Sequence, residues 1–315
     1  VYRTKNKETY FRNKSIESEY TIKSDLVYNL SDNMELNFGA SYKITDFEYD
    51  LWSRQDTLFL YDQLTGDSTF VKEFPEWRNN ETKQSYKTAL YSQLSWDIFK
   101  RLRFTGGLRL DYFDYNEFSS ISPRLGLSYF LDRKTTLNMA YGMHYQTPSY
   151  VELTSNPLNK NLDNKYTEQY VAGIEKIFGE DIRVTLEAYY KSYHDVPVGR
   201  GSTTPEAFDT YDGERLNKGE GYAQGIEFFF QKKLTDKFSA IVSYSHSVSK
   251  AKDPRSLVDT KFDEYYDWDY DYRNVFTLIG GYKLKLYKDE WYQNLKKQLW
   301  YKITNWLLPF GDEVE

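Results

Sequence analysis

The sequence predicts an all-β fold, an antiparallel up-and-down transmembrane β-barrel of which about eleven strands are present. Three observations support this prediction. Apolar and polar residues alternate over stretches of roughly ten residues, the length of a transmembrane strand. Tight and long connections follow one another along the chain. Aromatic residues make up 18% of the sequence, although its mean hydropathy is only -0.76.

Composition limits the class of protein further. The chain has no apolar run of about 20 residues, which excludes a transmembrane helix, and its 31 Tyr, 20 Phe and 7 Trp fit aromatic girdles at two membrane interfaces. The absence of cysteine excludes disulfides and thiolate metal sites. A net charge of -6 argues against a nucleic-acid partner, because binding phosphates needs concentrated basic charge.

The alternation is clearest after residue 181. Ile182, Val184, Leu186, Ala188 and Tyr190 form one face of a strand, whereas the residues between them are mostly polar. The same pattern places strands near residues 20–30, 34–44, 86–98, 102–112, 125–131, 137–145, 170–178, 182–191, 222–230, 238–248 and 272–287. Residues 1–16 are expected to form an extracellular loop, and residues 17–287 the strands with their connections.

The connections differ in length in a regular way. They are tight after the first, third, fifth, seventh and ninth strands, and long at about residues 46–81, 147–164, 194–219 and 251–270. In an up-and-down sheet this places the turns at one end and the loops at the other, as in outer-membrane barrels with short periplasmic turns and long extracellular loops. Because bacterial barrels of this kind use an even number of strands, eleven strands are expected to form an incomplete barrel.

Residues 288–315 differ from the rest of the chain. Trp291, Leu295, Leu299 and Ile303 recur at helical spacing with lysines between them, until Pro309. This pattern predicts an amphipathic helix resting on the inner headgroups of the membrane. A plain connector to a following strand is the alternative.

Three stretches give the chain a family resemblance. They are Ser122-Pro123-Arg124-Leu125-Gly126-Leu127-Ser128-Tyr129, Thr147-Pro148-Ser149-Tyr150-Val151-Glu152-Leu153, and Gly221-Tyr222-Ala223-Gln224-Gly225-Ile226-Glu227 with Asp271-Tyr272-Arg273 downstream. In order and spacing they resemble the C-terminal barrel of TonB-dependent outer-membrane receptors, particularly those of Bacteroidota. One departure is Val171, where the family often has a carboxylate.

The resemblance implies a barrel of about 22 strands, closed by an N-terminal plug domain that this sequence lacks. It further implies energised import of a siderophore, glycan or peptide across the outer membrane of a Gram-negative bacterium. The implied partners are outer-membrane lipid, the plug, an inner-membrane energy-coupling complex and a surface lipoprotein, and no cofactor is expected. A passive pore or a β-barrel enzyme is the alternative, but the chain has no nucleophile elbow, metal-ligand spacing or phosphate loop, so an enzyme is not expected.

Charged residues on the polar strand faces are candidates for guiding a substrate or holding the plug. They are Arg103, Arg109, Arg124, Arg183, Glu187 and Glu227. The alternative is that they pair with one another along a wet barrel wall.

Two further groups contain residue types that bind metal ions. His144, His194 and His246 fall near the extracellular ends of strands, but strands that run in the same direction lie about 10 Å apart, too far for shared chelation. Carboxylates at Asp263, Glu264, Asp267, Asp269 and Asp271 carry the oxygen ligands that Ca²⁺ prefers, but without EF-hand spacing. A solvated acidic loop is expected there, and no metal site is assigned.

Aromatic residues in the loops are the best candidates for substrate contact, because aromatic faces stack on ring-containing solutes at little entropic cost. They are Trp52, Tyr61, Trp77, Tyr145, Tyr150, Tyr265 and Trp268. Membership of the outer girdle is the alternative for each of them.

Overall fold

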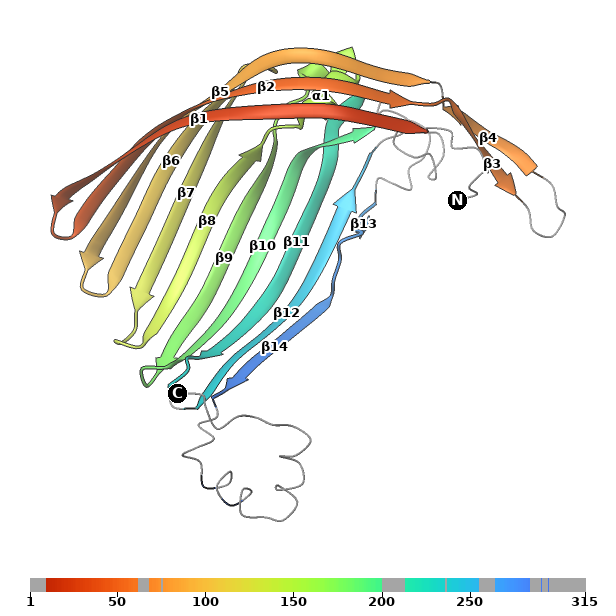
Figure 1. Ribbon diagram of the computed structural model, residues 1–315. Helices are drawn as coiled ribbons and strands as arrows, with labels where there is room; N and C mark the ends of the chain where they lie inside the picture. The colour runs from red at the N-terminus through yellow and green to blue at the C-terminus, as the bar shows by residue number, and fades with distance from the viewer. Residues whose placement is uncertain are drawn as a thin grey trace.

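The computed structural model is a curved antiparallel sheet that runs as a trough from β1 to β14 (Figure 1). It describes residues 10–61, 68–74, 76–199, 213–235, 237–254 and 264–283, together with Glu290 and Asn294. The main sheet has the strand order β1-β2-β5-β6-β7-β8-β9-β10-β11-β12-β13, and β14 pairs with β12 below β13. Because β13 and β14 share one place beside β12, the twelve strands occupy eleven positions. The predicted fold class is confirmed.

The strands of the main sheet are β1 (Phe11–Ser31), β2 (Met34–Ser53), β5 (Trp77–Phe99), β6 (Leu102–Phe113), β7 (Phe118–Phe130), β8 (Thr135–Gln146), β9 (Lys165–Phe178), β10 (Ile182–Gly199), β11 (Arg215–Lys232), β12 (Phe238–Lys252), β13 (Tyr266–Asp267) and β14 (Asn274–Tyr282). A separate hairpin is formed by β3 (Asp56–Tyr61) and β4 (Ser68–Phe74). The helix α1 (Tyr150–Ser155) and the 3-10 helix η1 (Pro157–Asn161) connect β8 to β9.

The two faces of the sheet differ in chemistry. The outer face carries large apolar side chains that remain exposed, among them Leu186, Ile226 and Met139 at 46%, 54% and 59%. The inner face is the one on which α1 packs, and it carries most of the charged strand residues. An apolar face that no protein element covers among the described residues fits contact with lipid, because strands that span a membrane alternate lipid-facing and lumen-facing residues.

Tyrosines line the outer face toward its long-loop end. Tyr86 lies between Tyr42 and Tyr112, with ring centroids 6.0 and 6.4 Å apart, and the same level is continued by Tyr141–Tyr170 at 5.0 Å and Tyr190–Tyr222 at 6.3 Å. At the opposite end Tyr129, Phe178, Phe238 and Tyr282 are exposed. These two levels have the form of the aromatic girdles that flank the apolar band of a membrane barrel.

The expected boundaries differ from the structure at the long-loop end. β1 begins at Phe11, inside the segment 1–16 expected to be a loop, and β2 continues to Ser53 while β5 begins at Trp77. Most of the insertion expected at 46–81 is therefore strand and hairpin. The phase of the alternation changes along β2: above Ile44 the apolar side chains Phe47, Tyr49 and Leu51 are buried on the inner face, and Asp46, Glu48 and Asp50 alternate with them.

The sheet is open among the described residues. There β1 pairs only with β2, and β14 pairs only with β12. None of the described helices is long and apolar enough to cross a membrane. The amphipathic helix expected in residues 288–315 lies almost entirely outside the described residues.

The open edges lead to a prediction for the chain produced as residues 1–315 alone. Unpaired edge groups cannot be satisfied by lipid, so we expect no heat-resistant, faster-migrating folded band on a gel after incubation with lipid vesicles. The full-length protein, treated in the same way, is the positive control. A stable inserted monomer of residues 1–315 would contradict the prediction.

Candidate functional site

The connection between β8 and β9 folds inward and forms a compact element, the α1–η1 module (residues 147–164). Ser149 caps α1: its side chain accepts the backbone N–H of Glu152, and the Glu152 carboxylate accepts the backbone N–H of Ser149 at 3.0 Å. This reciprocal capping box satisfies two N–H groups that a helix start leaves without partners. Pro157 opens η1, where a missing N–H costs nothing. The sequence pattern predicts a loop at residues 147–164, but the structure forms two short helices there, because the capping residues stabilise their ends.

The module packs against the inner face of the sheet. Leu153 is 1% exposed, and with Tyr150 and Leu162 it joins a buried cluster that contains Phe47 of β2 and Phe113 of β6. The Tyr150 ring lies 4.5 Å from Phe47 and 5.6 Å from Phe113, centroid to centroid. This cluster explains why the inner face of β2 becomes apolar above Ile44.

Asn159 fixes the other end of the module. Its fully buried side chain donates to the carbonyl oxygens of Glu152 and Gly213, at 3.0 and 3.2 Å, and accepts the backbone N–H of Arg215 at 2.8 Å. The module is thereby joined to the start of β11, and Asn79 of β5 donates to Thr154 at 2.8 Å. Four strands from different parts of the chain, β2, β5, β6 and β11, therefore contact the module and hold it over the inner face.

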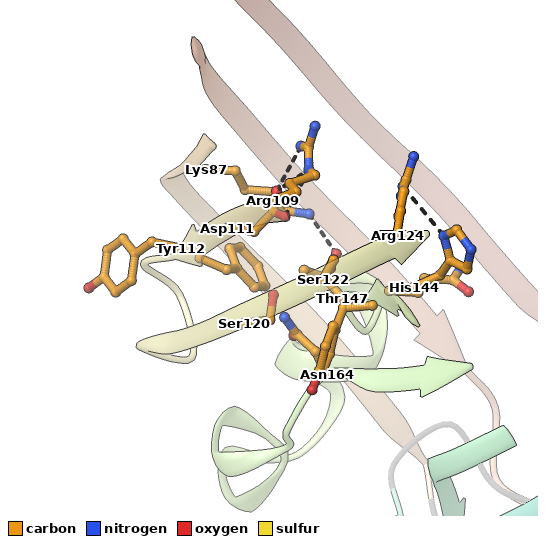
Figure 2. Close-up of a pocket in the computed structure, with 13 residues that line it drawn as sticks. Lys87, Arg109, Asp111, Tyr112, Ser120, Ser122, Arg124, His144, Thr147 and Asn164 are labelled. Carbon is orange, nitrogen blue, oxygen red and sulfur yellow. Dashed lines mark hydrogen bonds and ion pairs between the residues drawn. The ribbon is translucent and has the colours of Figure 1, made fainter. Parts of the chain in front are cut away.

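A cavity of about 380 Å³ lies beside the module, between the upper ends of β6, β7 and β8 (Figure 2). The ladder between β7 and β8 ends at Arg124 and Gly142, next to Pro123, which has no backbone N–H to donate. Beyond that point Ser120 and Ser122 on β7 are no longer paired with His144 and Gln146 on β8. The cavity occupies this split.

The cavity is lined by more positive than negative charge. Arg109 pairs with Asp111 at 2.7 Å, whereas Arg124 lies 3.4 Å from the His144 ring and, among the described residues, has no carboxylate within ion-pair distance. Lys87 is half-buried: its ammonium donates to Thr147 Oγ1 at 2.7 Å and lies 4.3 Å from the centre of the Phe113 ring. Nearby, burial raises the pKa of the Tyr115 phenol above its ordinary value.

The six charged residues predicted for the inner face lie on that face by register. Arg103 pairs with Asp97 at 2.6 Å and Arg183 with Glu175 at 2.5 Å. Glu187 and Glu227 stand directly opposite each other on β10 and β11, and within the described part of the chain neither has a basic partner within 4.0 Å. Ion pairs with other carboxylates of the wall, and not with one another, therefore account for Arg103, Arg109 and Arg183, but not for Arg124 or the two glutamates.

The seven aromatic candidates do not gather in one place. Tyr145 lines the cavity, between the rings of Phe118 and Tyr166 at 6.1 and 5.2 Å, and Tyr150 and Trp77 belong to the cluster under the module. The Trp52 indole donates to Glu76 at 2.9 Å, and the Tyr61 side chain lies outside the described residues.

The last two aromatic candidates lie at the end of the sheet near β13. Trp268 meets Tyr193 edge-on at 5.5 Å, and Tyr265 meets Tyr222 of the outer tyrosine level at 5.3 Å. Contact of any of the seven with a substrate stays a prediction.

The candidate metal-binding residues are also spread out. His194 stacks on Tyr166 at 4.7 Å, His246 lies on the outer face beside Asn274, and His144 borders the cavity. Asp267 and Asp271 both pair with Arg273, at 2.9 and 2.5 Å, and Asp263 lies outside the described residues. Across the described ranges, no three His, Asp or Glu side chains come together in a way that would hold a metal ion.

Lys87, Ser120 and Asn159 belong to the site, although the sequence pattern does not single them out. Only the capping pattern Ser149-x-x-Glu152 could have indicated the inward module; nothing local to Lys87 marks it as half-buried, since its partners come from β6 and residues 147–150.

Comparisons with known proteins agree with this architecture. A family model described as TonB dependent receptor-like, beta-barrel matches residues 2–301. No curated protein matches the chain. Among solved structures, the ferripyoverdine receptor of the outer membrane of Pseudomonas aeruginosa is 13% identical with a TM-score of 0.58, covering 87% of this chain and 37% of that chain.

Two further structures are similar in the same way. The FrpB iron transporter from Neisseria meningitidis is 14% identical with a TM-score of 0.56, over 78% of this chain and 37% of that one. The outer membrane transporter YddB from Escherichia coli is 12% identical with a TM-score of 0.56, over 85% and 40%. The chain thus spans about two fifths of the length of these proteins.

Proposed function

Because this chain belongs to the TonB-dependent receptor-like β-barrel family, we propose that it forms part of the wall of an outer-membrane receptor that imports a solute by energised transport. The observation that carries this proposal is the family match over residues 2–301. The exposed apolar outer face and its tyrosine level support a position in a membrane, and the polar inner face supports a lumen. In this function the chain acts as a receptor wall and not as an enzyme.

The proposed partners follow from the family and from the inner face. They are outer-membrane lipid, a plug domain of the full-length protein, an inner-membrane energy-coupling complex and a surface lipoprotein. Glu187 and Glu227 support a contact with the plug, because two facing carboxylates without a basic partner in the described residues offer a place for an arginine or lysine from another element. The order of motifs between residues 122 and 282 supports a receptor of the Bacteroidota type.

The proposed substrate is a siderophore, glycan or peptide. Two of the three neighbours named above are a ferripyoverdine receptor and an iron transporter. Tyr145, beside the cavity, is the predicted aromatic contact best placed for a solute in the lumen, since it lies at the level of the module that overhangs the inner face.

The test is uptake by the full-length protein in cells. Candidate ferric siderophores, oligosaccharides and peptides are offered with and without a protonophore that collapses the inner-membrane energy supply. We expect accumulation of the transported solute to stop with the protonophore, because import by this family depends on that supply. Uptake that continued unchanged would identify a passive pore instead.

A further inference from the structure

We propose that the cavity beside the α1–η1 module binds an anionic group, a carboxylate or phosphate presented in the lumen. This inference rests on the proposed function, because it assigns a chemical class to what the receptor wall contacts. Three features of the cavity carry it: an excess of positive charge, hydroxyl groups with unused hydrogen-bonding capacity, and a fixed geometry.

The charge excess comes from residues on three strands. Lys87 on β5, Arg109 on β6 and Arg124 on β7 line the cavity. Among the described residues the only carboxylate that lines it is that of Asp111, which forms an ion pair with Arg109. Lys87 and Arg124 therefore remain without a carboxylate within ion-pair distance among the described residues. Figure 2 shows Lys87 and Arg109 on one side of the cavity, and Arg124 with His144 on the other. Two cations without counter-ions in a partly enclosed site favour a negatively charged ligand.

Hydroxyl groups supply the second feature. Ser120 is 5% exposed and lines the cavity, and its Oγ has no hydrogen-bond partner among the residues that the structure describes. A buried hydroxyl without a partner is costly unless something else satisfies it. Thr147 Oγ1 accepts from Lys87, and no acceptor for its own hydrogen lies within the described residues. Both hydroxyls can donate to the oxygen atoms of a bound anion.

The geometry is held by surrounding structure. Lys87 is fixed between Thr147 and the rings of Phe113 and Tyr150, with its ammonium 4.3 and 5.3 Å from their centres. The split between β7 and β8 keeps the cavity open toward the inner face. A planar arginine and a fixed ammonium at one site can contact a carboxylate or phosphate from two sides.

Two sources could present such a group: the imported solute, or an acidic side chain of the plug domain. The experiment separates them. Purified full-length receptor in detergent is titrated calorimetrically with citrate and, separately, with inorganic phosphate, at constant ionic strength because salt screens exposed charges. The variants are Arg124→Gln and Lys87→Gln, with Arg124→Lys as the conservative replacement. Arg183→Gln is the matched control, since Arg183 lies on the same face but pairs with Glu175.

If the solute is the source, citrate or phosphate binds the unmodified receptor. We then expect at least tenfold weaker binding to Arg124→Gln and Lys87→Gln, partial recovery in Arg124→Lys, and no change in Arg183→Gln. If the plug is the source, neither probe binds, but amide hydrogen exchange in the plug becomes faster in Arg124→Gln and not in Arg183→Gln. The absence of both effects, or equal effects in the control, would overturn the proposal.

Failure of this inference and failure of the proposed function are distinguishable. Calorimetry and hydrogen exchange report equilibrium binding and need no energy supply. Uptake that continued with the protonophore would contradict energised transport but not the anion site. Energised uptake without a change in anion binding or plug exchange in the variants would contradict the anion site but not the receptor function.

Discussion

Leu186→Arg is expected to destabilise the folded, membrane-inserted receptor by about 2–4 kcal/mol. Leu186 lies on the outer face of β10, is 46% exposed, and stands between Phe178 at the short-turn end and the Tyr190–Tyr222 pair at the other. A charge at this depth loses its water without gaining a partner. The measurement is equilibrium unfolding of the full-length protein in lipid vesicles, followed by tryptophan fluorescence and gel mobility.

Ser245→Arg is the matched control for that experiment. Ser245 is paired with Glu227 on the inner face, one residue further along β12 than Tyr244, which shares the outer row of Leu186 and Phe228. An arginine there remains in the lumen and gains a carboxylate neighbour, so we expect little change in the free energy of unfolding. Equal losses from both substitutions would remove the assignment of the outer face to lipid.

Leu153→Ala is expected to loosen the α1–η1 module by about 2–5 kcal/mol, because the change removes buried methyl groups and leaves a cavity. Leu153 is 1% exposed within the cluster formed with Phe47 and Phe113. Hydrogen exchange of amides 150–162 measures the opening, and the expected loss corresponds to exchange faster by a factor of roughly 30 or more.

Leu158→Ala is the control for the module. Leu158 lies in η1, only a few residues away, and is 54% exposed, so the same chemical change removes little buried area. Its amide exchange should remain close to that of the unmodified protein. Similar acceleration in both variants would mean that packing on the inner face does not hold the module in place.

The membrane-spanning part of the fold could be predicted from the sequence, because each strand obeys one rule there. Apolar residues at every second position must face lipid, so the strand of Ile182, Leu186 and Tyr190 is recognisable without any knowledge of its neighbours. The order of tight turns and long loops then fixes an up-and-down sheet. On the long-loop side of the outer tyrosines the strands no longer face lipid, so alternation alone does not predict which side chains are buried.

The inner site could not be predicted to the same extent because its parts depend on contacts distant in sequence. Phe47 becomes inner core only because Leu153 and Tyr150 arrive from the β8–β9 connection to cover it. Alternation alone predicts that the charged wall residues lie on the inner face of the sheet, but it does not predict their ion-pair partners. Which arginine keeps a free charge is decided by whether Asp97, Asp111 or Glu175 lies within reach, a property of register and side-chain direction.

The change of phase in β2 has a consequence for insertions and deletions. Ile44 belongs to a segment whose outer residues must be apolar, and Phe47 to a segment whose inner residues must be apolar. Because side chains alternate, removing one residue between them would shift the rest of the strand by half a period and turn Phe47, Tyr49 and Leu51 away from α1. Substitutions near Thr45 therefore affect only local packing. A change of chain length there would instead remove the contacts by which β2 packs against the α1–η1 module.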